Sequence, residues 1–291
     1  MLYRVLTYLP ESIADAVRNA AALQGSPPDE IRLYRNGRVV VVLGGRQVTT
    51  LTVCGGDMLR ETVMKLCGNS LYAHAETIRQ GYIFTQDGFR VGVSGRAVCH
   101  DGRIECVTDI SSLCIRIPRR FPGCVDDIYP VAVEDAVPHS ILIWSVPGAG
   151  KTTALRELSV MLTDERAPYR TSVIDTRFEL SAGLEGEYLD IFRGYPRTLG
   201  MEMAVRTMNP QFVLCDEIAT EADSRAVMLC ASSGVAVIAS AHGSSLADLR
   251  RKGPIKELME NNIFHAYVGL QRVDGQVVHL IQKGERPCSY K

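Results

Sequence analysis

Residues 139–162 read HSILIWSVPGAGKTTALRELSVML, and the class of fold follows from this segment. The apolar run HSILIW predicts a buried strand, and KTTALRELSVML predicts a helix that begins at Lys151. The segment SVPGAGKTT between them has the context of a phosphate-binding loop, with a strand before it and a helix after it. Gly148 and Gly150 let such a loop turn its N–H groups inward, beside the positive end of the helix dipole.

The loop supplies the first candidate ligands. We expect Lys151 to contact the β and γ phosphates of ATP, and Thr152 to bind Mg²⁺ through its hydroxyl. Ser145 stands where such loops usually have their first glycine, and a serine can turn there if its dihedral angles permit. The alternative is an ordinary glycine-rich turn between a strand and a helix. The predicted nucleotide-binding residues are Ser145, Val146, Pro147, Gly148, Ala149, Gly150, Lys151, Thr152 and Thr153.

A second apolar strand ends in two acids. The run FVLCDE brings Asp216 and Glu217 to the carboxyl end of a buried strand, where ligands of open parallel sheets bind. We expect Asp216 to complete the Mg²⁺ site and Glu217 to polarise the attacking water as the general base. An acidic pair after a strand is often only a solvated loop, but here it follows a phosphate-binding loop in one array of strands and helices. The sequence therefore predicts ATP hydrolysis with ATP and Mg²⁺ as ligands.

Two more strand ends carry polar residues. His242 follows the buried run VAVIASA, and we expect it to contact the γ-phosphate or orient the water, although a lone histidine often has no catalytic role. Glu179 follows the strand of VIDTRFEL together with Asp175, and it is a further candidate catalytic acid. A strand-end loop with capping acids is an equally good interpretation of VIDTRFEL.

Arginines are the last candidates, because an arginine of the same or a neighbouring subunit can stabilise charge on a transferred phosphoryl group. Arg206 lies on the predicted helix before FVLCDE, while Arg90, Arg96 and Arg116 lie earlier in the chain. Each alone is more typical of a surface residue. We expect at least one of the four to reach a nucleotide.

The first part of the chain mixes helices with strands. Helices are predicted at 11–23 and 57–67, strand-rich runs include RVVVVL and RIECVTDISSLCIRI, and Asp87-Gly88 predicts a hairpin turn. Prolines then crowd residues 118–138, which indicates a linker. We predict an α+β domain at 1–125.

The second part alternates strands and helices. Its strands are continuous apolar runs, as expected when helices cover both faces of a parallel sheet. We therefore predict an α/β P-loop NTPase domain with a parallel sheet at 126–291, preceded by the smaller α+β domain.

Composition narrows the possible partners and the compartment. The 32 Lys and Arg residues balance the 33 Asp and Glu residues, so a nucleic-acid partner is not expected. The nine cysteines, scattered as far as Cys288, predict reduced thiols in a cytosolic protein, and the N-terminal sequence lacks the pattern of a secretion signal. An uncharged stretch between Arg225 and Asp248 is long enough to span a bilayer, but serines and glycines interrupt it.

Several of these segments together carry a resemblance to a known family. SVPGAGKTT, VIDTRFEL, GYPRTLGMEMAVRTMNPQFVLCDEIATEADSRAV and SSGVAVIASAHGSSL resemble the RecA-like ATPases of type II, type IV pilus and type IV secretion machines. The first part also matches, through YLPESIADAV, DEIRLYRNGR, NSLYAHAETIRQGYIFTQDGFRVGVSGRAV and ISSLCIRIPR. The full-length pattern is similar to the stage III sporulation protein AA family of endospore-forming bacteria.

The resemblance implies a hexameric RecA-like ATPase in the cytoplasm of the mother cell, docked on membrane proteins of a channel-like apparatus between mother cell and forespore. It makes VIDTRFEL the aspartate box, Asp216 and Glu217 the Walker B acids, and ASAHGSS the histidine box. It also places Arg90, Arg96 and Arg116 in segments that lie over the nucleotide in secretion ATPases.

The sequence departs from the family pattern at several points. Ala219 stands where secretion ATPases commonly carry an arginine, Ser145 replaces the first loop glycine, and the tetracysteine module of the type II enzymes is missing from the sequence. Two other functions remain open at this stage: an ATP-dependent switch or scaffold with little turnover, and a RecA-like nucleic-acid motor.

Overall fold

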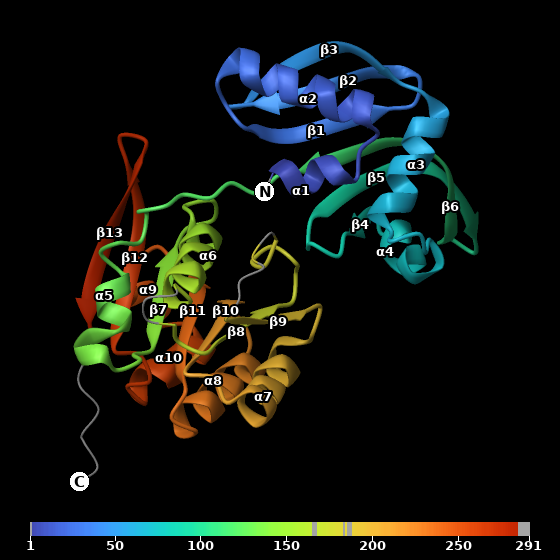
Figure 1. The fold of residues 1–291 in the computed structure, drawn as a ribbon. Helices are drawn as coiled ribbons and strands as arrows, with labels where there is room; N and C mark the ends of the chain where they lie inside the picture. The colour runs from blue at the N-terminus through green and yellow to red at the C-terminus, as the bar shows by residue number, and fades with distance from the viewer. Residues whose placement is uncertain (1, 165–167, 183, 185–187, 285–291) are drawn as a thin grey trace. The chain divides into compact units, whose positions relative to one another are not determined.

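The computed structural model describes residues 2–164, 168–182, 184 and 188–284, so Cys288 lies outside the described residues. The chain divides into two compact units, Met1–Arg119 and Arg120–Lys291. Figure 1 follows the chain through both units, which are described separately below. A smaller α+β unit therefore precedes an α/β unit, and this part of the predicted fold class is confirmed.

The amino-terminal unit is built on an antiparallel six-stranded sheet with the order β3-β2-β1-β6-β5-β4. Helix α2 packs on β1, β2 and β3 and buries Ile13 and Val17 in the core of this unit. The Asp87-Gly88 turn joins β4 to β5 as predicted, with Phe84 paired to Arg90. The elements are α1 (Leu2–Thr7), α2 (Glu11–Gln24), β1 (Pro28–Tyr34), β2 (Gly37–Leu43), β3 (Arg46–Cys54), α3 (Gly56–Leu66), η1 (Tyr72–His74), α4 (Ala75–Arg79), β4 (Tyr82–Phe84), β5 (Arg90–His100) and β6 (Arg103–Arg116).

The carboxy-terminal unit contains a seven-stranded sheet with the order β13-β12-β7-β11-β10-β8-β9. All its strand pairs are parallel except β12 with β13, which forms an antiparallel hairpin at one edge. The elements are α5 (Tyr129–Ala132), η2 (Glu134–Ala136), β7 (Ile141–Ser145), α6 (Lys151–Leu162), β8 (Thr171–Asp175), β9 (Leu189–Arg193), α7 (Arg197–Met208), β10 (Phe212–Glu217), α8 (Glu221–Ser232), β11 (Ala236–His242), α9 (Leu246–Leu249), α10 (Gly253–Glu260), β12 (Ala266–Val273) and β13 (Gln276–Lys283).

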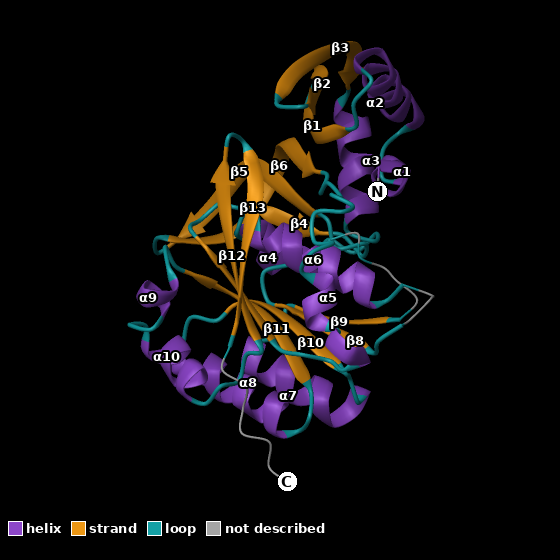
Figure 2. Ribbon diagram, turned by 90° about the vertical axis from the view of Figure 1, so that its left-hand side faces the viewer, coloured by secondary structure: helices purple, strands orange, loops and turns teal. Residues whose placement is uncertain are grey.

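Helices cover both faces of this sheet. Alternate residues of β7 enter two separate cores: Ile141 and Ile143 pack with α5 and α6, while Leu142 and Trp144 belong to the core that α7, α8 and α10 complete. In Figure 2 the helices α7, α8 and α10 line one side of the sheet. This arrangement explains why the central strands are apolar throughout rather than alternating.

The start of the unit is attached to helix α6 by an ion pair. Arg120 donates two hydrogen bonds to the carboxylate of Glu157, from Nε at 2.7 Å and Nη2 at 2.9 Å, and the Phe121 N–H donates a third at 2.9 Å. Burial of Glu157 acts to raise its carboxyl pKa, but these bonds outweigh burial and hold that pKa below its ordinary value.

Among the described residues, no helix combines the length and the apolar character needed to cross a bilayer. The uncharged stretch between Arg225 and Asp248 instead forms most of α8, the buried strand β11 and the start of α9.

Candidate nucleotide-binding site

The predicted phosphate loop connects β7 to α6. Gly148 has a φ of 76° and Gly150 a φ of 109°, in the left-handed region that glycine adopts without strain. Ser145 is the last residue of β7 and has no positive φ, so this position does not require a glycine. Its hydroxyl donates to the Val146 carbonyl at 2.9 Å. The departure at Ser145 therefore leaves the loop geometry intact.

Lys151 is buried at the first position of α6, with 8% of its surface exposed. Its ammonium donates to the carbonyl of Ser145 at 3.2 Å, to the hydroxyl of Ser145 at 3.2 Å and to the carbonyl of Val146 at 3.4 Å. Burial lowers the pKa of Lys151, and the nearby carboxylates of Glu217 and Asp216 oppose this shift only in part.

His242 joins Lys151 to Glu217. The Lys151 ammonium lies 3.1 Å from His242 Nδ1, and His242 Nε2 lies 3.2 Å from an oxygen of Glu217. Because an ammonium can only donate, Nδ1 accepts this bond, and the proton of the neutral ring is on Nε2, facing the carboxylate. The three side chains come from β7–α6, β11 and β10, and they meet because β11 lies between β7 and β10.

Asp216 and Glu217 lie half-buried at the end of β10. The pairing of β10 with β11 shifts register between Cys215 and Glu217, so a bulge lies at Asp216. Bulges commonly redirect a side chain beside a functional site. The Ser240 hydroxyl donates to Asp216 Oδ1 at 3.1 Å and holds that carboxylate in place.

The two acids of VIDTRFEL have different environments. Asp175 is buried at the end of β8, where its two oxygens accept the N–H groups of Glu179 at 3.0 Å and Ser181 at 2.7 Å. Arg156 of α6 donates to the carbonyls of Glu179 and Leu180. Asp175 thus braces the loop after β8, whereas the Glu179 side chain is exposed on that loop.

The candidate arginines are dispersed. Arg206 is exposed in the last turn of α7, near the amino-terminal end of β10. The loop and the acids lie at the opposite, carboxyl ends of β7 and β10. The structure therefore does not bring Arg206 to the loop of its own chain. In the amino-terminal unit, Arg96 lies 3.2 Å from Asp109, Arg116 lies 3.9 Å from Glu30, and the Arg90 guanidinium lies 4.6 Å from the centre of the Tyr82 ring.

The structure adds Lys252 to the candidate residues. Its ammonium donates to the backbone carbonyl of His242 and lies 3.8 Å from Asp248. The only signal in the sequence is the basic run Arg250, Arg251 and Lys252, which resembles any solvated charged turn. The sequence does not predict the contact of Lys252 with His242, because this contact depends on how the segment after β11 folds back on the strand end.

A cavity of about 530 Å³ adjoins the start of α6. The turn Gly150, Thr153 and Ala154 forms one wall, and Leu270 of β12 and Val278 of β13 form another. A largely apolar hollow beside a phosphate loop has the size and character of a small-molecule site.

A glycine loop between β7 and α6, an acidic pair at the end of β10 and a histidine at the end of β11 define the RecA-like ATPase fold, and two solved structures share it. The Legionella pneumophila ATPase DotB superposes with a TM-score of 0.60 at 14% identity, covering 94% of this chain and 80% of that one. The pilus retraction motor PilT, solved with bound ADP, superposes with a TM-score of 0.61 at 12% identity, covering 91% and 83%. The predicted RecA-like fold is confirmed.

The sequence gives a narrower assignment. The family described as sporulation stage III, protein AA matches residues 7–285. Stage III sporulation protein AA of Bacillus subtilis (strain 168) is 29% identical over 277 residues, which cover 92% of this chain and 90% of that protein. The chain belongs to the sporulation stage III, protein AA family, as its motifs indicated.

Proposed function

We propose that this chain hydrolyses ATP in the presence of Mg²⁺ and works as an oligomeric motor on a secretion-like apparatus of sporulation. The observation that carries this proposal is the line of contacts from Lys151 through His242 to Glu217. It joins a phosphate-binding cation to a carboxylate that can act as a base, at the edge of the sheet where RecA-like folds bind ligands.

The loop residues Ser145 to Thr153 would hold the phosphates. The positive φ angles of Gly148 and Gly150 suit a loop whose N–H groups bind an anion, and the dipole of α6 favours an anion at its first turn. Lys151, now bonded to loop carbonyls, would turn to the β and γ phosphates. The Thr152 hydroxyl and the Asp216 carboxylate offer the oxygen ligands that Mg²⁺ prefers. The ion would neutralise charge that develops on the phosphate oxygens.

Glu217 is the proposed general base for the attacking water, and His242 would orient the γ-phosphate or that water. The Nε2–H of His242 points at Glu217, which keeps the carboxylate in one orientation. Glu179 is the second candidate acid, because it lies exposed on a loop that Asp175 holds rigidly at the end of β8.

The cavity beside α6 suits the nucleoside part of ATP. Leu270, Val278 and Phe121 offer apolar surface for the base, while Asp127 and Arg272 offer polar groups for the ribose. A pocket that continues from the phosphate loop favours a nucleotide over a small phosphate ester.

The family and the fold support the rest of the proposal. The structural neighbours are called an ATPase and a pilus retraction motor, and the family is a sporulation family. We therefore propose a homo-oligomer, a hexamer, that docks from the cytoplasm on membrane proteins of a channel-like apparatus between mother cell and forespore. Arg96 and Arg116 are candidates to complete a site of the same or a neighbouring subunit, and Arg206 is a candidate only for the site of a neighbouring subunit.

Two variants test the chemistry. In Lys151→Ala the charge for the β and γ phosphates is gone, so ATP affinity, measured by equilibrium titration, is expected to fall strongly. In Glu217→Gln the loop and Asp216 remain, so ATP should bind while steady-state turnover falls by about a hundredfold or more. Glu221→Gln, an exposed acid at the start of α8, is the matched control and should keep wild-type turnover.

Each variant can also contradict the proposal. Unchanged ATP affinity in Lys151→Ala would exclude this loop as the phosphate site. Wild-type turnover in Glu217→Gln would transfer the role of base to another acid, with Glu179 tested next.

A further inference from the structure

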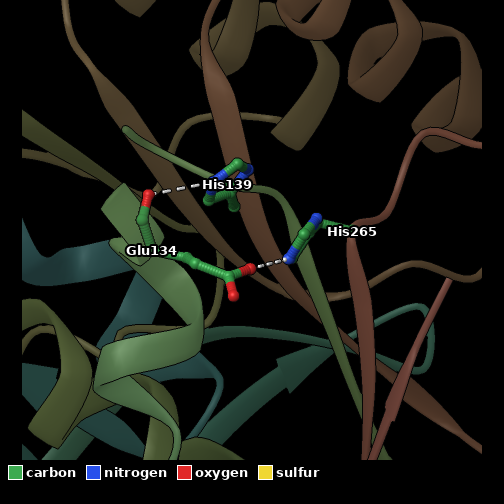
Figure 3. Close-up of side chains that lie close together, drawn as sticks. All are labelled: Glu134, His139 and His265. Carbon is green, nitrogen blue, oxygen red and sulfur yellow. Dashed lines mark hydrogen bonds and ion pairs between the residues drawn. The ribbon is translucent and has the colours of Figure 1, made fainter. Parts of the chain in front are cut away.

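A cluster of side chains that can bind a metal ion lies where strands β7 and β12 begin, at the opposite end of β7 from the phosphate loop. Glu134 belongs to η2, His139 precedes β7 and His265 precedes β12 (Figure 3). Strands β7 and β12 are parallel neighbours, with Ile141 paired to Ala266, so the two histidines that precede them lie side by side. Each of the three residues offers one ligand atom, and these atoms lie within 4.8 Å of one another.

Backbone contacts fix the positions of both histidines. The His139 N–H donates to the carbonyl of Ala132 at 2.8 Å, and the His265 N–H donates to the carbonyl of Ser140 at 2.9 Å. Their rings stack, with centroids 4.2 Å apart and an angle of 23° between the planes. These backbone contacts and the ring stacking keep the metal-binding atoms close together even when no metal ion is bound.

Glu134 and His139 each have an outer contact of the kind that orients metal ligands, and Glu134 and His265 contact each other directly. One oxygen of Glu134 lies 2.5 Å from the Lys283 ammonium, and the other lies 2.8 Å from His265 Nε2. His139 Nε2 lies 3.2 Å from the backbone carbonyl of Glu134. When Nε2 donates its proton to that carbonyl, the lone pair of the neutral ring is on Nδ1, and outer hydrogen bonds of this type orient metal-binding histidines.

We propose that Glu134, His139 and His265 bind one divalent transition-metal ion, and that zinc(II) is the ion that suits them best. Two imidazoles and a carboxylate form a known zinc ligand set. Zinc bonds of about 2.0–2.1 Å separate tetrahedral ligand atoms by about 3.3 Å, so small side-chain rotations suffice to close the site.

The ion would connect two segments that are far apart in sequence, the segment from Glu134 to His139 and the start of β12 beside His265. It ties η2 to the starts of β7 and β12, while Lys283 at the end of β13 holds the remaining oxygen of Glu134. Within the described residues, no second group of three such side chains has this spacing. The proposed metal site would be separate from the phosphate loop, because the two lie at opposite ends of β7.

Zinc titration of the full-length protein without nucleotide, in competition with a chromophoric chelator, tests the proposal. We expect one tightly bound ion per chain. His139→Ala and His265→Ala should each weaken binding by at least about tenfold. His100→Ala is the matched control, because this exposed histidine of β5 lies beside Asp101 in the amino-terminal unit and is not one of the three proposed ligands, so this variant should bind zinc like the wild type.

Two more measurements keep the test decisive if a histidine variant folds poorly. Glu134→Gln keeps the side-chain shape, and zinc should raise the melting temperature of the wild type but not of this variant. Cobalt(II) should give the visible bands of a nitrogen and oxygen site. The proposal is overturned by the absence of saturable zinc binding, by unchanged affinity in both histidine variants, or by a sulfur-to-cobalt charge-transfer band, which would place the ion on cysteines.

Discussion

The buried ammonium of Lys151 should make nucleotide binding sensitive to alkaline pH. Burial lowers the lysine pKa from its ordinary value of 10.5 in the free protein, while bound phosphates would raise it again. ATP affinity is therefore expected to be full at neutral pH and to decline as the pH rises through the lowered pKa. Equilibrium titrations across this range measure the decline.

Lys151→Arg supplies the control for this pH profile. A guanidinium stays charged at every accessible pH, so the affinity of this variant, though lower, should remain flat where the wild type declines. Identical profiles for the two proteins would mean that another group titrates.

His242 should contribute more to turnover than to binding. Without its ring, Lys151 still has the loop oxygens, but Glu217 loses the partner that orients it. We expect His242→Ala to lower the turnover number by about ten- to a hundredfold with little change in ATP affinity. A variant that loses affinity and keeps its turnover number would show that the histidine serves binding instead.

Residues that a local motif specifies could be predicted from the sequence. Gly148, Gly150 and Lys151 stand at fixed spacings in one loop, and Asp216 ends an apolar strand. Their mutual contacts could not be predicted, because they depend on β11 lying between β7 and β10. The same applies to Ser240 and Lys252, which have no motif and become relevant only through their contacts with Asp216 and His242.

At the scale of elements, the close contact of β12 with β7 depends on a glycine. A Cβ atom on Gly269 would lie 2.5 Å from the ring of Trp144, which is packed into the core. Gly269→Ala should destabilise the protein by about 1–3 kcal/mol in urea unfolding. Trp144 is the single tryptophan, so its fluorescence reports this unit directly.

Gly253→Ala is the matched control, because no atom lies within 4 Å of its added Cβ and the residue begins helix α10. It should be neutral or slightly stabilising. Equal stability of the two variants would show that the indole ring moves aside without cost.

Element prediction succeeded where burial gives a strong pattern. The strands β7, β8, β10 and β11 are buried over most of their length because helices cover both faces of the sheet, and helix α6 occupies the predicted residues 151–162. Strand β1 was not predicted, since PDEIRLY begins with a proline and two acids. Strand β13 was also not predicted, because it is an exposed edge strand whose position depends on pairing with β12.

At the scale of the whole molecule, the stability of the carboxy-terminal unit should depend on the residue at which a fragment begins. A fragment that starts at Arg120 keeps the partner of Glu157 and the buried side chain of Val125. One that starts at residue 126 loses both and should be less stable by about 3–5 kcal/mol. Urea unfolding of the two fragments measures the difference, and equal stability would show that the residues before 126 contribute nothing.

The longer fragment also tests the arginines of the amino-terminal unit. If Arg96 or Arg116 completes the active site, this fragment should bind ATP but hydrolyse it more slowly, by on the order of a thousandfold. Arg96→Ala and Arg116→Ala in the full chain should reproduce part of the loss with unchanged thermal melting. Hydrolysis at the full rate in all three proteins would show that these arginines are not part of the site.

The ion pair between Arg120 and Glu157 has a mechanical consequence. Arg120 is the first residue of the carboxy-terminal unit, and Glu157 lies on the same helix as Lys151. A tensile load on the chain at Arg119 would therefore be shared with α6 through two charge-assisted hydrogen bonds, rather than being carried by the following backbone alone. In the other direction, if α6 moves when its first turn binds phosphate, Glu157 would move with it and would pull on Arg120.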